Sequence, residues 1–283
     1  MGSRMAANLR RAGFELTVHN RTLATARDWA AEHGAQVADS PAAVAERSDV
    51  LITMVVDGAQ VESVLLGPKG GVHGAHEGLL FIDMSTIAPS DTRRIGAELA
   101  RHEIHFMDAP VTGSAPRAED GTLTIMAGGD ADDFERARSL FEAMGELIVH
   151  VGELGDGEMV KLINNAVAAV NAAVVGQALL VGRGTGVDLD ALVEVMEAGS
   201  GASAMLELKS RPMREHDYTT LFKLEHMLKD VRLCLEEGQA AGVPFPFAAL
   251  AREILTAGRG RGLGDHDFAA LIEVLEGEAG RRL

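Results

Sequence analysis

The sequence predicts an α/β domain built on a doubly wound parallel sheet, followed by an all-α domain, with a long helix joining the two. Short apolar runs alternate with helical stretches from residue 14 to about residue 151, as parallel strands do when crossover helices connect them. From about residue 154 onward the strand pattern stops and apolar positions recur at helical spacing. We therefore expect residues 1–152 to form the first domain and residues 153–283 the second.

The individual elements follow from these patterns. The expected strands are FELTV, DVLITMVV, GLLFIDM, IHFMDA, LTIMAGG and ELIVHV. In the first domain helices are expected at residues 3–12, 23–33, 40–47, 58–66, 90–102 and 132–144, and several begin at a Ser, Thr or Asp that can cap them. In the second they are expected at residues 157–184, 188–198, 221–241, 247–258 and 267–276. The first of these is unusually long for a globular protein, so we expect it to join the two domains as a hinge or a spine.

Composition narrows the class of protein. The chain of 283 residues has a formal net charge of -16 and is 47% hydrophobic, which is typical of a globular protein and argues against a nucleic-acid partner. Cys234 is the only cysteine, so no internal disulfide forms, which fits a reducing cytoplasm. Cys234 lies on an apolar helix stripe, which favours a packing role over that of a nucleophile. The most apolar segment, residues 166–182, is interrupted by Asn171 and Gln177, which favours a buried or interfacial helix over a membrane span.

The opening stretch, MGSRMAANLRRAGFELTVHNRT, is typical of the second half of a nucleotide-binding unit. Gly2 lies just ahead of the first helical turn, where the third glycine of a dinucleotide fingerprint allows close helix packing. Asn20, Arg21 and Thr22 follow the next strand, and a basic residue there could bind the 2′-phosphate of NADP. A solvated turn explains Arg21 equally well.

Two later stretches offer hydroxyls and glycines at strand ends. In FIDMST, Thr86 follows an apolar strand, and ligands bind at the carboxyl ends of parallel strands. Thr112, Gly113 and Ser114 are expected in a loop whose backbone N–H groups and hydroxyls suit a small carboxylate. A simple helix cap would explain Thr86, and turn chemistry alone would explain the loop.

Lys161 is the most informative residue of the second half. It lies in an otherwise apolar stretch, and Asn165 follows one helical turn later on the same face. Burying a lysine is costly unless it is paired or its pKa is lowered, which is what a general acid/base needs. A lysine that extends along the helix surface to reach water is the alternative. Phe222 precedes a helix that carries Lys229 and Asp230, a pair that is usually solvated surface.

Taken in order, these motifs resemble the β-hydroxyacid dehydrogenase family, which includes 3-hydroxyisobutyrate dehydrogenases, tartronate semialdehyde reductases and glyoxylate/succinic semialdehyde reductases. The resemblance spans the whole chain. It depends on MG..MA.NL..AG, FIDMST, DAPVTGS....EDGTL..M.GG, G..G.G...K..NN and F.L..M.KD. Each motif is weak or moderate alone, but the five in this order are specific.

The resemblance implies a Rossmann-type first domain and a set of cofactor contacts. Gly2 matches the last glycine of the G-x-G-x-x-G turn, and Arg21 matches the basic position of NADP-preferring members, so NADP is expected and NAD is less favoured. Thr86 matches a threonine near the nicotinamide and the substrate, and Lys229 matches a lysine that reaches toward the cofactor. The first strand and the first two glycines of the motif would precede Met1. We therefore expect a chain that begins inside its own cofactor loop, through a mis-assigned start or a truncation.

The resemblance also implies the substrate site. Lys161 matches the catalytic lysine and Asn165 the substrate-binding asparagine, while Phe222 and Asp230 match further active-site positions. The segment 112–114 reads Thr-Gly-Ser where many members have Ser-Gly-Gly, so the carboxylate contacts are expected to differ.

The expected activity is reversible hydride transfer between NADP and a small β-hydroxy acid or its semialdehyde. Lys161 would exchange the proton, with a pKa lowered by desolvation, and Asn165 would orient the reacting oxygen. The apolar length left to bury in the helical domain favours a homodimer or homotetramer. Two alternatives stay open: an imine reductase on the same scaffold, whose members usually replace the lysine, and a catalytically silent dinucleotide-binding protein.

Overall fold

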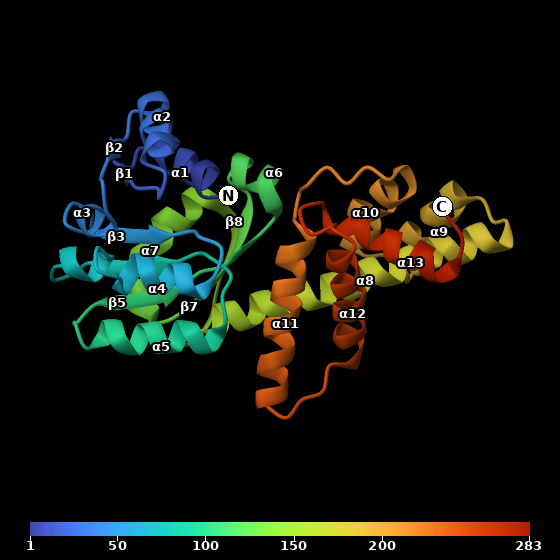
Figure 1. The fold of residues 1–283 in the computed structure, drawn as a ribbon. Helices are drawn as coiled ribbons and strands as arrows, with labels where there is room; N and C mark the ends of the chain where they lie inside the picture. Colours follow the sequence, from blue (N-terminus) through green and yellow to red (C-terminus); the bar gives the residue numbers. More distant parts are fainter. The chain divides into compact units, whose positions relative to one another are not determined.

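The computed structural model describes residues 1–283, which form two compact units. The first comprises Met1–Lys161 and contains all the strands; the second comprises Leu162–Leu283 and is entirely helical (Figure 1). The boundary lies inside helix α8 (Asp156–Thr185), whereas the sequence pattern predicts it after residue 152, before that helix begins.

The larger sheet of the first unit confirms the predicted α/β class and shows that the sheet is mixed. Its six strands are β3 (Val50–Thr53), β4 (Leu80–Asp83), β5 (His105–Asp108), β6 (Val111–Thr112), β7 (Leu123–Gly128) and β8 (Gly145–Gly152). Strands β3, β4 and β5 are parallel, but β7 runs antiparallel to β5 and β6, and its other edge pairs in parallel with β8. The chain passes from β5 through β6 and helix α6 (Ser114–Asp120) to β7, and this connection turns the chain back so that β7 pairs antiparallel with both β5 and β6.

The strands β1 (Thr17–Val18) and β2 (Gln36–Val37) form a separate parallel pair. Neither pairs with β3, so the strands of this unit form two sheets rather than one. Phe14 and Leu16, predicted to begin the strand FELTV, lie outside β1 but still pack with Val50 and Ile52 of β3 against one hydrophobic cluster. The two sheets therefore share a core without sharing hydrogen bonds.

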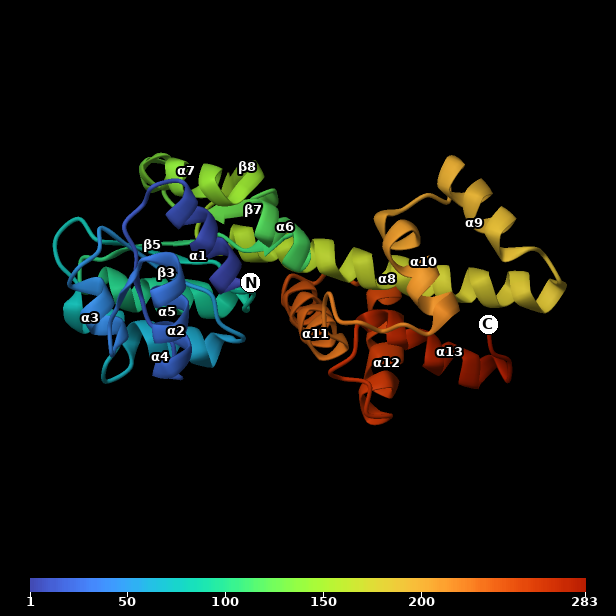
Figure 2. The same ribbon diagram turned by 90° about the horizontal axis from the view of Figure 1, so that it is seen from above.

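Helices cover both faces of the larger sheet, which is why β4 is buried along its whole length. Leu80 and Ile82 of β4 pack in one cluster with residues of α1 and α7, while Phe81 packs in the other with residues of α4 and α5. The helices of this unit are α1 (Gly2–Arg11), α2 (Leu23–His33), α3 (Pro41–Ala45), α4 (Gly58–Leu66), the 3₁₀ turn η1 (Gly71–Gly74), α5 (Pro89–Ala100), α6 (Ser114–Asp120) and α7 (Ala131–Met144) (Figures 1 and 2). The alternation along β4 is the period of two expected of a strand.

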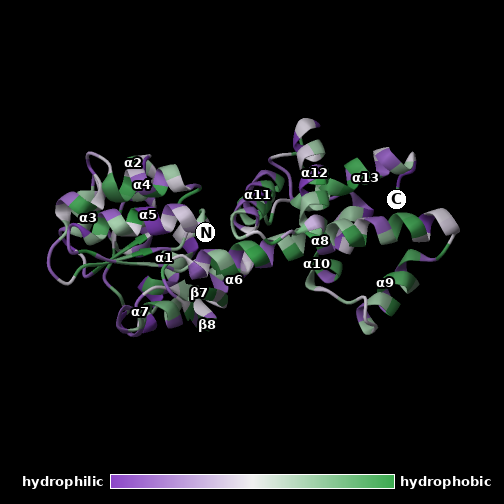
Figure 3. Ribbon diagram, turned by 90° about the horizontal axis from the view of Figure 1, so that it is seen from below, coloured by the Kyte–Doolittle hydropathy of each residue, from purple (hydrophilic) through white to green (hydrophobic).

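The second unit is a group of helices around the later part of α8. They are α9 (Leu189–Ala198), α10 (Ala204–Glu215), α11 (Leu224–Ala240), α12 (Pro246–Gly260), the 3₁₀ turn η2 (Phe268–Leu271) and α13 (Ile272–Ala279). Small residues on α8 allow close packing: a Cβ added at Gly176 would lie 2.9 Å from a methyl group of Leu275. Hydrophobic residues line much of α8 (Figure 3). By length and composition alone α8 could cross a membrane, but 56% of its most apolar window is buried inside the protein, and a core helix passes the same test.

Two helices were not predicted from the sequence. Helix α6 begins at Ser114, in the stretch expected to be a loop, and α10 contains Pro212 within its last turn. Proline removes one helical hydrogen bond and is normally excluded from helix interiors. Burial of Leu206 and Met213, both 0% exposed, provides packing that favours α10 despite the proline.

Candidate active site

The glycine-rich motifs of the first unit meet around one buried carboxylate, Asp108 at the end of β5. Asp108 is 0% exposed. One of its oxygens accepts a hydrogen bond from the backbone N–H of Gly155 at 2.7 Å, and the other accepts from the backbone N–H of Glu158, also at 2.7 Å. These donors lie just before and within the first turn of α8, so Asp108 caps that helix from a strand 47 and 50 residues earlier in the chain.

The glycines of these motifs leave the space that this contact needs. A Cβ at Gly128 would lie 2.7 Å from one Asp108 oxygen, and a Cβ at Gly157 would lie 2.7 Å from the other and 2.4 Å from the carbonyl oxygen of Met126. Gly155 has a φ of +90°, a conformation that favours glycine. Gly128 and Gly157 are thus explained by the close approach of the backbone to the Asp108 carboxylate, and Gly155 by its backbone conformation.

The environment of Asp108 disfavours its charge. Burial raises its pKa from 3.8 to about 6, the hydrogen bonds from Gly155 and Glu158 oppose this shift, and the neighbouring Asp83 carboxylate adds to it. Charge is costly where water is excluded, even when N–H donors partly replace the water.

Asp83, at the end of β4, organises the turn that carries Thr86. It is 0% exposed, and one of its oxygens accepts hydrogen bonds from the hydroxyls of Thr53 and Ser85, each at 2.6 Å. The hydroxyl oxygen of Ser85 in turn accepts from the backbone N–H of Val55 at 2.9 Å. The segment therefore links the carboxyl ends of β3 and β4, and half-buried Thr86 follows it.

Lys161 and Asn165 lie one turn apart on α8 and are 6% and 5% exposed. The amide nitrogen of Asn165 donates to Asp230 of α11 at 2.7 Å, and its amide oxygen accepts from Asn164 at 3.1 Å. The other carboxylate oxygen of Asp230 lies 3.0 Å from the ammonium of Lys229. Asp230, expected to contact substrate, thus binds two residues of its own chain and fixes the orientation of Asn165.

Phe222 lies in the segment that leads into α11 and is half-buried. Its ring meets Phe268 and His226 edge to face, with centroids 6.3 and 5.9 Å away. Its backbone N–H donates to Asp267 at 3.0 Å, and Asp267 also pairs with the ammonium of Lys209 at 2.7 Å.

Asp267 and Lys209 were not predicted as part of the site. Both are almost fully buried, at 2% and 3% exposed. In the sequence Asp267 is simply the first residue of a predicted helix, and nothing near it marks Lys209 as its partner.

The predicted cofactor-binding residues of the first unit lie at the start of α1 and after β1. The first turn of α1, which begins at Gly2, carries no acidic residue and no side-chain cap, so this helix start and its dipole can bind an anion. Asn20 accepts a hydrogen bond from the backbone N–H of Thr22 at 2.8 Å, and this turn presents Arg21 on the surface. These features fit the phosphate groups of a dinucleotide. A Cβ at Gly2 would make only ordinary contact, 3.5 Å from Met54.

The segment 112–114 is not the loop that was predicted. Thr112 ends β6, Gly113 precedes α6 and Ser114 begins it. Gly113 has a φ of +133° and Ser114 a φ of +59°, and the second value is uncommon for a residue with a Cβ. Such backbone strain is often found at binding sites.

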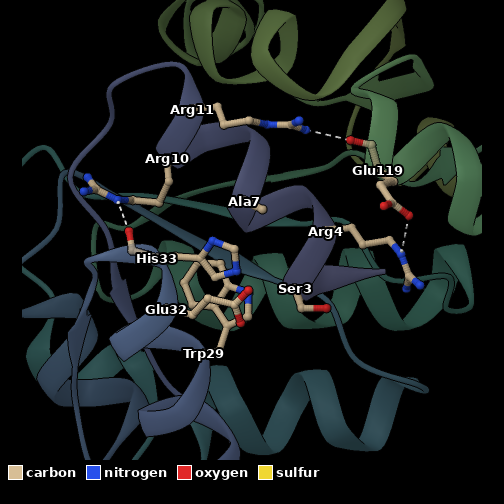
Figure 4. Close-up of a pocket in the computed structure, with 9 residues that line it drawn as sticks. All are labelled: Ser3, Arg4, Ala7, Arg10, Arg11, Trp29, Glu32, His33 and Glu119. Carbon is tan, nitrogen blue, oxygen red and sulfur yellow. Dashed lines mark hydrogen bonds and ion pairs between the residues drawn. The ribbon is translucent and has the colours of Figure 1, made fainter.

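One cavity of the first unit is lined by none of the predicted site residues. It has a volume of about 710 Å³ and opens between α1, α2 and α6 (Figure 4). It is lined by Ser3, Arg4, Ala7, Arg10, Arg11, Trp29, Glu32, His33 and Glu119. Arg10 donates to the carbonyl oxygens of Phe14 and His33, and Arg11 donates to that of Glu119. These arginines hold the chain's own backbone, which explains their presence structurally.

Comparison with known families matches both units. Residues 1–152 match the NAD binding domain of 6-phosphogluconate dehydrogenase. Residues 155–275 match the family described as NAD-binding of NADP-dependent 3-hydroxyisobutyrate dehydrogenase. These two matches place the chain among NAD(P)-dependent oxidoreductases of hydroxy acids.

Individual proteins agree with this assignment. Glyoxylate/succinic semialdehyde reductase 1 of Arabidopsis thaliana is 35% identical over 98% of this chain and 95% of its own length. The 2-hydroxy-3-oxopropionate reductase of Escherichia coli is 34% identical over 100% and 96%. The structure of Mycobacterium tuberculosis 3-hydroxyisobutyrate dehydrogenase with L-serine superposes with a TM-score of 0.89 at 31% identity, covering 97% of this chain and 95% of that one. The chain belongs to the β-hydroxyacid dehydrogenase family.

An imine reductase from Myxococcus stipitatus also shares the fold, with a TM-score of 0.60 at 21% identity over 97% of this chain and 96% of its own. Identity at this level shows the fold alone.

Proposed function

We propose that this protein transfers a hydride reversibly between NADP(H) and a small β-hydroxy acid or its semialdehyde. The observation that carries the proposal is the buried pair Lys161 and Asn165, one turn apart on α8, with the amide of Asn165 oriented by Asp230. A proton donor beside an oriented amide is what reduction of an aldehyde requires. The names of the Arabidopsis and Escherichia coli relatives support the substrate class.

The chain's own residues would hold the cofactor at two places in the first unit. The start of α1 at Gly2 would bind the pyrophosphate, and the turn 20–22 would bind the ribose, with Arg21 pairing with the 2′-phosphate of NADP. Thr86 and Lys229 are proposed as further contacts. When bound, the nicotinamide supplies the hydride chemistry.

The remaining residues would handle the substrate and its proton. Lys161 would donate a proton to the aldehyde oxygen during reduction and remove it from the hydroxyl during oxidation. Asn165 would orient the same oxygen, and residues 112–114 with Phe222 would hold the rest of the substrate. Such alignment is a large part of the rate, because it replaces a bimolecular encounter by a positioned reaction.

Replacing Lys161 by methionine tests the proposal. We expect Lys161→Met to lower kcat by at least about 100-fold, measured as NADPH oxidation with glyoxylate, succinic semialdehyde, methylmalonate semialdehyde and tartronate semialdehyde. Lys69→Met, at an exposed lysine of the same unit, is the matched control and should keep full activity. Retained NADPH binding by Lys161→Met would establish that the variant is folded. Near-normal turnover would refute the assignment.

The alternatives give different outcomes in the same assays. An imine reductase would reduce cyclic imines in preference to the semialdehydes, although the presence of Lys161 argues against it. A silent dinucleotide-binding protein would bind NADPH and reduce none of these compounds.

We also propose that the protein is a homodimer in the cytoplasm. Within the second unit, α8 exposes Ile163, Val167, Val174 and Val181, between 44% and 65% each. Their spacing of four, seven and seven residues is that of a coiled-coil seam, which a second copy of the chain could cover. The single, buried cysteine, Cys234, fits a reducing compartment.

A further inference from the structure

The cap on α8 differs in kind from the other helix caps of the chain. Asp57, Asp130 and Asp188 each immediately precede the helix that they cap and accept from its first turn. Asp108 instead reaches α8 from the end of β5, across 47 residues of sequence to Gly155. A local cap stabilises a helix, whereas a cap supplied by a distant strand also fixes where the helix starts relative to the sheet.

The geometry extends this constraint to Lys161. The backbone N–H of Glu158 donates a hydrogen bond to Asp108. Glu158 lies three residues before Lys161 on the same rigid helix. A shift of the first turn of α8 is therefore carried directly to the base of the Lys161 side chain. Asp108 itself is completely buried and its charge is disfavoured, so a local, exposed cap would stabilise the helix at lower cost.

We propose that Asp108 is a positioning residue: its carboxylate holds the first turn of α8 at the carboxyl end of β5, and so sets the place from which Lys161 acts. This inference rests on the proposed function of Lys161. Asp108 makes no contact with substrate in this role, and Gly128 and Gly157 serve it by leaving room for the carboxylate.

Two variants disturb the contact between Asp108 and α8 from its two sides. Asp108→Asn keeps the shape of the side chain but leaves one acceptor oxygen for two N–H donors. Gly157→Ala keeps the carboxylate but places a Cβ 2.7 Å from it, although alanine favours helix more than glycine does. We expect each to lower kcat for semialdehyde reduction by at least about tenfold, since a misplacement of about 1 Å can cost about 100-fold. KM for NADPH should change by less than about threefold, because the start of α1 and the turn after β1 are untouched.

The control is Asp130→Ala, which removes an exposed local cap of α7 in the same unit. It should lose stability and keep kcat. Hydrogen exchange of the peptide covering residues 153–162, measured on the full chain, adds a readout independent of activity. The amides of this peptide should exchange at least about tenfold faster in Asp108→Asn and Gly157→Ala, but not in Asp130→Ala.

The outcomes separate this proposal from the one on which it rests. Faster exchange together with a selective fall in kcat supports the positioning role. Wild-type kcat in both variants, or unchanged exchange in Asp108→Asn, overturns it. If the wild-type protein reduces no semialdehyde while the exchange differences are found, the proposed function has failed and the anchoring of α8 has not.

Discussion

The charge of Asp108 should make the protein less stable as the pH rises, and Asp108→Asn should remove this effect. The pKa of Asp108 is about 6 in the folded protein against a usual value of 3.8, so the folded state holds this proton more tightly than the unfolded chain does. Its contribution to stability is therefore fully present below about pH 4 and is lost as the pH rises through about 6. The difference of about two pKa units corresponds to about 3 kcal/mol in total, of which about 1.4 kcal/mol falls between about pH 5 and pH 8.

The assay is urea unfolding of both proteins at a series of pH values. Trp29 is the only tryptophan and lies in the first unit, so its fluorescence follows the unit that contains Asp108. The free energy of unfolding of the wild type, minus that of Asp108→Asn, should fall by about 1.4 kcal/mol from about pH 5 to pH 8 and stay level above that range. Asp130→Asn, at an exposed cap of the same unit, is the control, because it removes a carboxylate that is exposed rather than buried.

If the difference in the free energy of unfolding between the wild type and Asp108→Asn stays constant or rises with pH, the prediction is wrong. It would mean that the N–H groups of Gly155 and Glu158 compensate fully for the burial of the carboxylate. Near pH 8 the relief of the buried charge should roughly offset the lost hydrogen bond, which contributes about 1.5–3 kcal/mol when its acceptor is charged. Asp108→Asn is thus expected to be about as stable as the wild type there, yet slower as an enzyme.

Three further predictions concern other parts of the protein. Asp267→Asn should lower the free energy of unfolding, measured with urea, by about 3 kcal/mol or more, because it leaves the buried ammonium of Lys209 unpaired. Asp265→Asn, at an exposed ion pair, is the control and should have a much smaller effect; equal losses in the two variants would contradict this prediction. Arg21→Ala should weaken NADPH binding at least about tenfold and leave NADH binding unchanged, as titration would measure; an equal effect on both cofactors would remove the argument for NADP. Val174→Asp should convert a dimer to monomers in analytical ultracentrifugation, because it places a charge on the exposed seam of α8; an unchanged dimer would place the interface elsewhere.

Much of the site could be predicted because it depends on local spacing. Lys161 and Asn165 share a face of α8 as a direct result of helical periodicity, and the turn 20–22 follows a strand that the apolar pattern marks. The functional roles of these residues stay predictions. The orientation of Asn165 by Asp230, however, joins residues 65 positions apart, and no local pattern indicates that contact.

The elements that were missed have physical explanations of the same kind. Pro212 argues against a helix by local rules, but burial of Leu206 and Met213 outweighs that preference in α10. The antiparallel direction of β7 depends on how the connection through β6 and α6 turns, since apolar runs look alike in both directions.

By itself the sequence determined the α/β class, the long apolar helix and the placement of Lys161 and Asn165 on one face of it, because these depend on composition and on periods of two and 3.6 residues. Only the tertiary structure decided which acceptor satisfies the first N–H groups of α8 and which carboxylate holds the segment before α11. Every helix start presents similar donors, and any of the many buried or exposed carboxylates could in principle bind them. Asp108 and Asp267 fill these roles because folding brings them next to N–H groups that lie far away in the sequence.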